Sequence, residues 1–265
     1  MKINAVELRT VKATRYVTPL REGGSLPAIV EADDDGLYVL KFRGAGQGPK
    51  ALIAELVVGE LGRALGLPVP EIVFVELDAT LARTEPDPEI QDLIRASDGL
   101  NLALDYLPGV IAFDPVVDKP ESTLASQVVW LDAYTTNVDR TPRNTNLLVW
   151  HGKLWLIDHG AALYFHHDWT NYQARSRSAF PQIKDHVLLP RAASLEEADA
   201  LLSQRVTPQL LRDILSLVPD DWLTFDSRFA DVGEHRAAYL EYFLKRLEPP
   251  RDFLKEAVNA RAVSV

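Results

Sequence analysis

Three polar residues between positions 137 and 160 have the types and the spacing of a metal and catalytic site. Asp139 is followed five positions later by Asn144, and Asp158 comes further along, directly before His159 and Gly160. Carboxylate and amide oxygens are ligands that Mg²⁺ accepts, with water and phosphate completing its shell. One carboxylate and one amide could therefore hold the metal, while the second carboxylate orients a hydroxyl group.

The residues between Asn144 and Asp158 predict the element that brings these side chains together. Two apolar runs, at residues 147–150 and 154–157, are separated by a His-Gly turn, which is the pattern of a β-hairpin. A hairpin returns the chain to its starting point, so Asp158 is expected beside the loop of Asp139 and Asn144. Each residue alone could instead build a turn or cap a strand. The joint spacing favours the metal site.

The same residues resemble the catalytic elements of known kinases. Asp139-Arg140, Asn144 and the Asp158-x-Gly160 element resemble those of the HipA-like kinases and, more distantly, of the phosphoinositide 3/4-kinases. The resemblance implies that Asp139 acts on the acceptor hydroxyl and that Asn144 and Asp158 bind Mg²⁺, with ATP as phosphate donor. It also implies an α+β, two-lobed protein-kinase-like fold. A small β-rich nucleotide-binding lobe would span residues 1–106, and a mainly helical catalytic lobe residues 107–265.

The first hundred residues predict the elements of a nucleotide lobe. Residues 28–32 and 37–42 are β-prone and flank an Asp-Asp-Asp-Gly turn, which predicts a hairpin. Residues 49–66 begin with proline, repeat leucine and end with glycine, which predicts a helix. Further strands are predicted over residues 71–77 and 99–106, with a polar insertion between them.

A lysine in the hairpin and a glutamate in the helix are the expected phosphate-binding pair. Lys41 interrupts an apolar strand, where it could simply be a solvated edge-strand lysine. In the kinases that the chain resembles, a strand lysine pairs with a helix glutamate and binds phosphate. Glu55 has the expected order and spacing. Glu60 is the competing residue, but it lies about 140° around the helix from Glu55, so both cannot face Lys41.

Two other segments are candidates for nucleotide contacts. The paired glycines before the hairpin would let backbone amides approach a phosphate, although a plain turn is the favoured interpretation of the pair taken alone. These residues are Gly23, Gly24 and Ser25. The resemblance implies that adenine is bound where the chain crosses between the lobes, and an ordinary strand-to-loop exit is the alternative there. The hinge candidates are Leu104, Asp105 and Leu107.

Beyond the hinge the chain has mainly helical patterns. Residues 120–136 predict a buried helix that leads into the catalytic loop, and residues 194–203, 207–217 and 233–247 predict further helices. Residues 161–190 have little periodicity and are the expected substrate-binding segment.

Composition limits the classes of function. The chain has 265 residues, 47% of them hydrophobic, a net charge of −10 and no cysteine. Broad nucleic-acid binding is not expected, because it needs clustered lysine and arginine. Disulfides and thiolate metal sites are excluded. No apolar run is long enough for a membrane span, and the N-terminus lacks the pattern of a signal peptide, so a cytoplasmic protein is expected.

The sequence therefore predicts an ATP- and Mg²⁺-dependent phosphotransferase acting on a hydroxyl, with a protein Ser or Thr as the favoured acceptor. Two alternatives stay open. One is a catalytically silent, pseudokinase-like regulatory module, suggested by Thr141 after the arginine, where many HipA-like kinases have histidine. The other is a kinase for small molecules, because the fold does not fix the acceptor.

Overall fold

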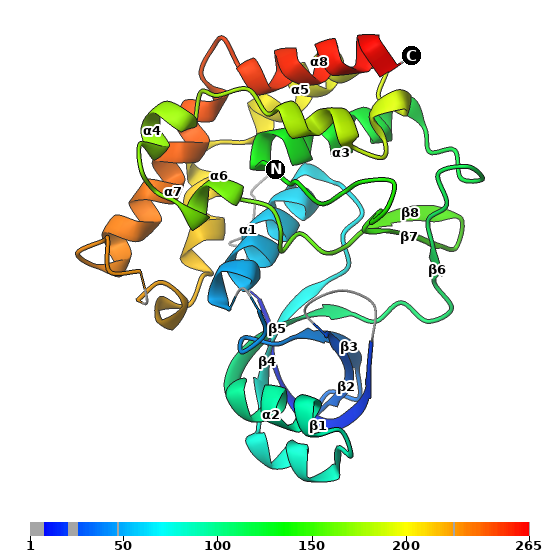
Figure 1. Cartoon of the computed structure of the whole chain (residues 1–265), viewed down its shortest axis with the longest axis vertical. Helices are drawn as coiled ribbons and strands as arrows, with labels where there is room; N and C mark the ends of the chain where they lie inside the picture. The colour runs from blue at the N-terminus through cyan, green and yellow to red at the C-terminus, as the bar shows by residue number, and fades with distance from the viewer. Residues whose placement is uncertain (1–7, 21–25, 47, 225, 265) are drawn as a thin grey trace.

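The computed structural model describes residues 8–20, 26–46, 48–224 and 226–264 of the chain. Five strands close into a small barrel in the order β1-β2-β3-β5-β4, in which only the β1 and β4 pair is parallel. They are β1 (Thr10–Pro19), β2 (Ala28–Ala32), β3 (Leu37–Lys41), β4 (Ile72–Leu77) and β5 (Gly99–Asp105). The 3₁₀ helix Ala79–Thr84 and helix α2 (Pro88–Ala96) connect β4 to β5 and pack against the barrel (Figure 1).

Alternation along the strands decides where Lys41 points. Successive side chains of a strand lie on opposite faces, and in β3 Tyr38 and Leu40 fill the barrel. Lys41 therefore lies on the outer face. Its partner on β5 is Leu102, which belongs to the larger core cluster outside the barrel.

Helix α1 (Pro49–Leu65) packs against this outer face and contacts β4 and β5 as well as helix α6. Proline is at its first turn, where the missing N–H is not needed, and Gly66 ends it in the left-handed conformation with φ 86°. Every residue from Leu52 to Gly62 is buried. The helix lies between the barrel and the C-terminal helices (Figure 1), and it carries Glu55 in its buried stretch.

The C-terminal helices surround α3, whose aromatic residues Trp130 and Tyr134 are fully buried and contact Phe253. Helix α3 contacts α5, α7 and α8. The helices of this part are α3 (Ser122–Thr135), α4 (Tyr172–Arg175), α5 (Leu195–Arg205), α6 (Pro208–Ser216), α7 (Val232–Leu247) and α8 (Asp252–Ser264). Short 3₁₀ helices lie at Tyr164–His167, Pro181–Asp185, Leu189–Arg191 and Asp220–Trp222.

A second, three-stranded antiparallel sheet holds the predicted hairpin. Its strands are β6 (Ile111–Ala112), β7 (Leu147–Trp150) and β8 (Lys153–Leu156). The turn residues His151 and Gly152 have φ of 49° and 71°, as a tight two-residue turn requires. The Ile157 amide donates to the Asn146 carbonyl at 3.1 Å. The hairpin thus returns the chain beside its start, as the sequence predicted.

Several elements were not predicted from the sequence. Among them are the long strand β1, which closes the barrel by pairing with β2 and β4, the short strand β6 and the last helix α8. No helix in the described part of the chain is long and apolar enough to span a membrane.

Candidate active site

Lys41 lies between two carboxylates. Its Nζ atom donates to Glu55 Oε2 at 3.1 Å and to Asp158 Oδ1 at 2.5 Å. The Lys41 side chain is 11% exposed, that of Glu55 is 1% exposed, and that of Asp158 is 40% exposed. The strand lysine, the helix glutamate and the residue after the hairpin therefore meet at one point. Glu60 faces elsewhere and forms an ion pair with Arg63 at 3.1 Å.

Burial and charge act in opposite directions on this cluster. Burial alone would lower the pKa of Lys41, but the carboxylates of Glu55 and Asp158 outweigh it and raise that pKa above its ordinary value. Burial would likewise raise the pKa of Glu55, but the charge of Lys41 and, to a smaller extent, the hydrogen bond from His159 lower that pKa to about 2. Lys41 and Glu55 are therefore both charged near neutral pH.

His159 contacts both carboxylate oxygens of Glu55. Its backbone N–H donates to Glu55 Oε2 at 2.8 Å, and its ring Nδ1 lies 3.5 Å from Glu55 Oε1. The ring is fully buried, and Nε2 has no partner among the described residues. A proton on Nδ1 would face the carboxylate, whereas a proton on Nε2 would be buried without an acceptor. The contacts thus favour the Nδ1–H tautomer.

The backbone conformation of Asp158 lets two consecutive residues contact the Lys41–Glu55 pair. Its φ is 55°, in the left-handed region that aspartate tolerates better than most residues. Consecutive residues of one turn consequently contact both members of the Lys41–Glu55 pair: the Asp158 carboxylate contacts the lysine and the His159 amide contacts the glutamate.

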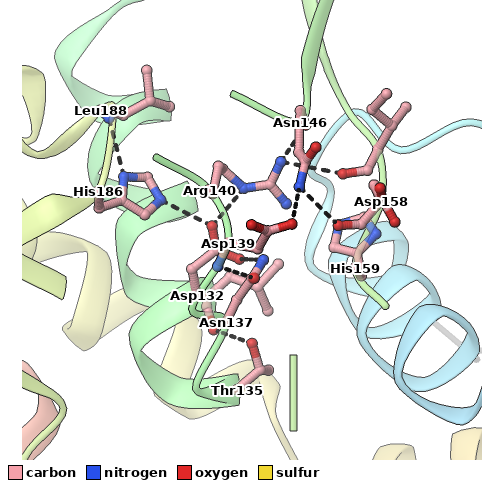
Figure 2. A network of polar contacts seen from close by, with 12 residues as sticks. Asp132, Thr135, Asn137, Asp139, Arg140, Asn146, Asp158, His159, His186 and Leu188 are labelled. Carbon is pink, nitrogen blue, oxygen red and sulfur yellow. Dashed lines mark hydrogen bonds and ion pairs between the residues drawn. The ribbon is translucent and has the colours of Figure 1, made fainter. Parts of the chain in front are cut away.

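Two asparagines hold the carboxylate of Asp139. Asn144 Nδ2 donates to Asp139 Oδ2 at 2.7 Å, and Asn146 Nδ2 lies 3.3 Å from the same oxygen and 3.5 Å from the Asp158 carbonyl oxygen. Asn146 therefore connects Asp139 and Asp158 (Figure 2). Burial raises the pKa of Asp139, the Asn146 contact opposes this, and the nearby Asp158 charge adds to it. A raised pKa makes the carboxylate a better proton acceptor.

A buried ion pair fixes the catalytic loop to α3. Arg140 Nε donates to Asp132 Oδ2 at 2.6 Å, and both side chains are 0% exposed. Asp132 also accepts from Asn137 Nδ2 at 3.0 Å and contacts His186 Nε2 at 2.9 Å. The Leu188 amide donates to the other ring nitrogen of His186, so Nε2 carries the proton that Asp132 accepts (Figure 2).

The same arginine also reaches the hairpin. Arg140 Nη1 donates to the carbonyl oxygens of Asn146, which directly precedes β7, and of Ile157, which directly follows β8. One guanidinium group thereby joins α3, the loop of Asp139 and the base of the β7–β8 hairpin. Its Nη2 atom has no partner among the described residues.

The oxygen atoms left over at the site suit a hard cation. Asn144 donates to Asp139 through Nδ2, so its side-chain oxygen Oδ1 can bind a cation. Asp158 accepts from Lys41 through Oδ1, so its Oδ2 can do the same. No group of three or more His, Asp or Glu side chains in the described chain forms a complete metal site. One amide and one carboxylate nevertheless fit Mg²⁺, which usually takes its other ligands from water and phosphate.

The expected nucleotide contacts are placed only in part. Gly23, Gly24 and Ser25 lie outside the described residues. Among the hinge candidates, Leu104 and Leu107 are buried, whereas Asp105 is exposed at the end of β5. The amides of Asp105 and Tyr106 donate to the carbonyl oxygens of Glu71 and Leu37.

Several residues of the site were not identified from the sequence. Asn146 repeats the amide of Asn144 two positions later, and Asp132 stands on a buried helix face, so both gave a local signal. His159 and His186 gave none, because a histidine beside a carboxylate partner is recognisable only after folding.

The whole chain is similar to known kinases. The chain matches the family model described as HipA-like kinase over residues 14–255. It is similar to the crystal structure of the Helicobacter pylori proinflammatory kinase CtkA, with a TM-score of 0.61 and 12% identity over 96% of this chain and 99% of that one. A search of curated protein sequences finds no match.

Two structures of a Golgi casein kinase show weaker similarity. The one with Mn and ADP bound has a TM-score of 0.47 and 12% identity, and the other has 0.44 and 13%. Both alignments cover 92% of this chain and 74% of that one.

The similarity to CtkA shows a kinase fold. Because the family model matches nearly the whole sequence, the chain belongs to the HipA-like kinase family, and the resemblance seen in the sequence is confirmed.

Proposed function

We propose that this protein is an ATP- and Mg²⁺-dependent phosphotransferase with a two-lobed fold, and that it moves the γ-phosphoryl group of ATP to a hydroxyl, with a protein Ser or Thr as the favoured acceptor. One observation carries the proposal: Lys41 is held by Glu55 and Asp158, and Asn146 connects Asp158 to Asp139. A phosphate-binding cation and a carboxylate proton acceptor thus share one site in a kinase family member.

Asp139 is proposed to orient the acceptor hydroxyl. The acceptor oxygen forms a bond to the γ-phosphorus, its O–H bond breaks, and the proton passes to the Asp139 carboxylate while ADP leaves. Asn144 and Asn146 hold one oxygen of this carboxylate, and no side chain of the described residues donates to the other, which would accept from the hydroxyl. The raised pKa of Asp139 favours this transfer.

Lys41 is proposed to bind the ATP phosphates, with Glu55 fixing its position. Asn144 and Asp158 would hold Mg²⁺, which neutralises phosphate charge when bound. Gly23, Gly24 and Ser25 remain expected phosphate contacts that lie outside the described residues.

The crossing near residues 106–107 is the proposed boundary between the two lobes and the adenine site. Leu104 and Leu107 would supply apolar surface, and the segment that includes Asp105 would supply backbone groups. The Leu107 amide supports this assignment, because no acceptor among the described residues bonds to it.

The test is phosphate transfer from radiolabelled ATP, with Mg²⁺, to the protein itself and to a panel of protein, peptide and small-molecule acceptors. Asp139→Ala and Asp158→Ala are each expected to abolish transfer. Asp92→Ala is the matched control, because this carboxylate is 79% exposed on α2 and pairs with Arg95 there. Activity that survives both substitutions at the site would refute the assignment. Tight ATP binding by calorimetry without transfer to any acceptor would instead favour the silent regulatory module.

A further inference from the structure

A small pocket beside the catalytic loop is lined by two arginines and by no acidic residue. Its volume is about 210 Å³, and Arg175 and Arg246 lie in its wall together with Tyr164, Ser178 and Gln182. This charge is unusual in a chain with a net charge of −10.

The pocket adjoins the site of proposed phosphate transfer. Thr136 contributes to its lining and ends α3, three residues before Asp139. The amide of Tyr164, which follows the Asp158-His159-Gly160 turn, donates to Thr136 Oγ1 at 3.1 Å. Three residues of extended chain span roughly 10 Å, so a polypeptide whose hydroxyl reaches Asp139 would have its next few side chains near the pocket.

Arg246 gives the pocket a fixed positive charge. It is 2% exposed and forms no ion pair with the described residues. It donates only to backbone carbonyls. Two of these belong to Ala133 and Tyr134, at the carboxyl end of α3, where the helix dipole partly balances the charge. A buried cation without a carboxylate partner favours an anion nearby.

Arg175 supplies donors that a ligand could use. Only its Nη1 atom is engaged, with the backbone oxygen of Asp168 at 2.6 Å and the Asp168 carboxylate at 3.4 Å. Its Nε and Nη2 atoms have no acceptor among the described residues. The amide of Gln182 and the hydroxyl of Tyr164, which is 54% exposed, likewise have no described partner. Several free donors and two positive charges therefore meet in one pocket.

We propose that this pocket binds an anionic side chain of a polypeptide acceptor, close in sequence to the hydroxyl that is phosphorylated. The inference rests on the proposed function, for which it names the acceptor class. A carboxylate and a phosphorylated side chain share the required chemistry, because each accepts several hydrogen bonds and carries negative charge.

The test uses Ser and Thr peptides in which a flanking position is fixed as Glu, phosphoserine, Gln or Lys. We expect kcat/KM about tenfold higher for the anionic peptides than for the Gln peptides, which corresponds to about one charge-assisted hydrogen bond. A preference for Glu and phosphoserine alike indicates a general anion site, and a preference for one alone identifies the source of the charge. Equal rates for Glu, Gln and Lys would overturn the proposal.

Charge reversal separates a pocket contact from a folding defect. Arg175→Glu is expected to reverse the ranking in favour of Lys, and Arg175→Gln to abolish the preference. A misfolded variant cannot gain activity toward Lys peptides. Arg177→Ala is the matched control, because Arg177 is exposed, pairs with Glu248 and does not line the pocket. Its ranking is expected to equal that of the wild type, and an unchanged ranking in Arg175→Glu would also overturn the proposal.

A binding measurement keeps this inference separate from the proposed function. If the wild type transfers phosphate to no peptide, fluorescence anisotropy with labelled Glu and Lys peptides still tests whether the pocket binds an anionic side chain. Tighter binding of the Glu peptide that Arg175→Glu reverses would support the pocket even where catalysis fails. Equal binding of both peptides would refute the pocket, whatever the fate of the kinase assignment.

Discussion

Replacement of Asp132 by asparagine tests whether the buried ion pair holds the catalytic loop in place. Asp132 accepts hydrogen bonds from Arg140 at 2.6 Å, Asn137 at 3.0 Å and His186 at 2.9 Å, and it is fully buried. Asparagine keeps the shape and one acceptor oxygen but removes the negative charge. The guanidinium group of Arg140, whose side chain is fully buried, then has no anionic partner among the described residues.

Loss of one partner of a buried ion pair costs about 3–5 kcal/mol, because the other charge remains buried. We expect Asp132→Asn to lower the free energy of unfolding by that amount, as measured by urea denaturation at pH 7. Asp168→Asn is the control. Asp168 is 62% exposed and lies 3.4 Å from Arg175, so a loss below about 1 kcal/mol is expected.

The pH dependence of the unfolding free energy gives a second test of the ion pair, and its direction follows from the pKa of Asp132. Burial would raise the pKa of Asp132, but Arg140 and His186 outweigh it and lower that pKa well below its ordinary value. Its stabilising contribution is therefore complete above the unfolded-state pKa of about 3.9 and is lost as the pH falls further. The stability difference between wild type and Asp132→Asn should narrow below about pH 4.

Two results would refute this reasoning. One is a loss in Asp132→Asn no larger than that of Asp168→Asn, which would mean that the buried pair contributes nothing beyond a surface pair. The other is a stability difference that stays constant between pH 7 and pH 3.

Three further predictions concern the other buried polar groups. Lys41→Ala and Glu55→Gln should each lower the transfer rate roughly 30- to 1000-fold, because about 2–4 kcal/mol of transition-state stabilisation is lost. The rate of the double variant should fall little below that of the worse single variant. Additive losses would contradict the pairing. His159→Asn, which can place an N–H near the Nδ1 position, should keep most of the transfer rate. His159→Gln should lower that rate about five- to tenfold. The reverse order would refute the Nδ1–H tautomer. Burial lowers the pKa of His166 far below its ordinary value, so unfolding free energy should fall as the pH drops below about 6.5, and less so in His166→Gln; equal falls in the two proteins would exclude His166 as the cause.

The local parts of the site were predictable from the sequence because short-range geometry determines them. A two-residue turn at His151-Gly152 sets the length of the hairpin, and the hairpin returns Asp158 to the neighbourhood of Asp139 and Asn144. The 3.6-residue period of α1 likewise predicted that Glu55 and Glu60 cannot both face Lys41, and the resemblance to the HipA-like kinases favoured Glu55. The structure places Glu55, and not Glu60, against Lys41.

The rest of the site depends on contacts between distant segments. Strand β1 has few buried residues and an exposed outer face, so it lacks the continuous apolar signal of a buried strand. His186 contacts Asp132 across 54 positions of sequence, and Arg246 contacts α3 from α7. Residue type and periodicity do not identify such partners, because they carry no information on which distant segments pack together.

Lys41 lies between two carboxylates of unequal burial, and that difference decides which contact nucleotide binding would change. Glu55 is 1% exposed and also accepts the His159 amide, so withdrawal of Lys41 would leave a buried carboxylate without its cation, at about 3–5 kcal/mol. Asp158 is 40% exposed, so water can solvate its carboxylate when the contact with Lys41 is lost, and that loss costs less than the loss of the Glu55 contact. A phosphate group that approaches Lys41 would therefore replace the Asp158 contact and leave the Glu55 contact in place. On the proposed function, the same exchange would free the Asp158 carboxylate for its role as a metal ligand, so the phosphate-binding lysine and the metal-binding aspartate would become available together.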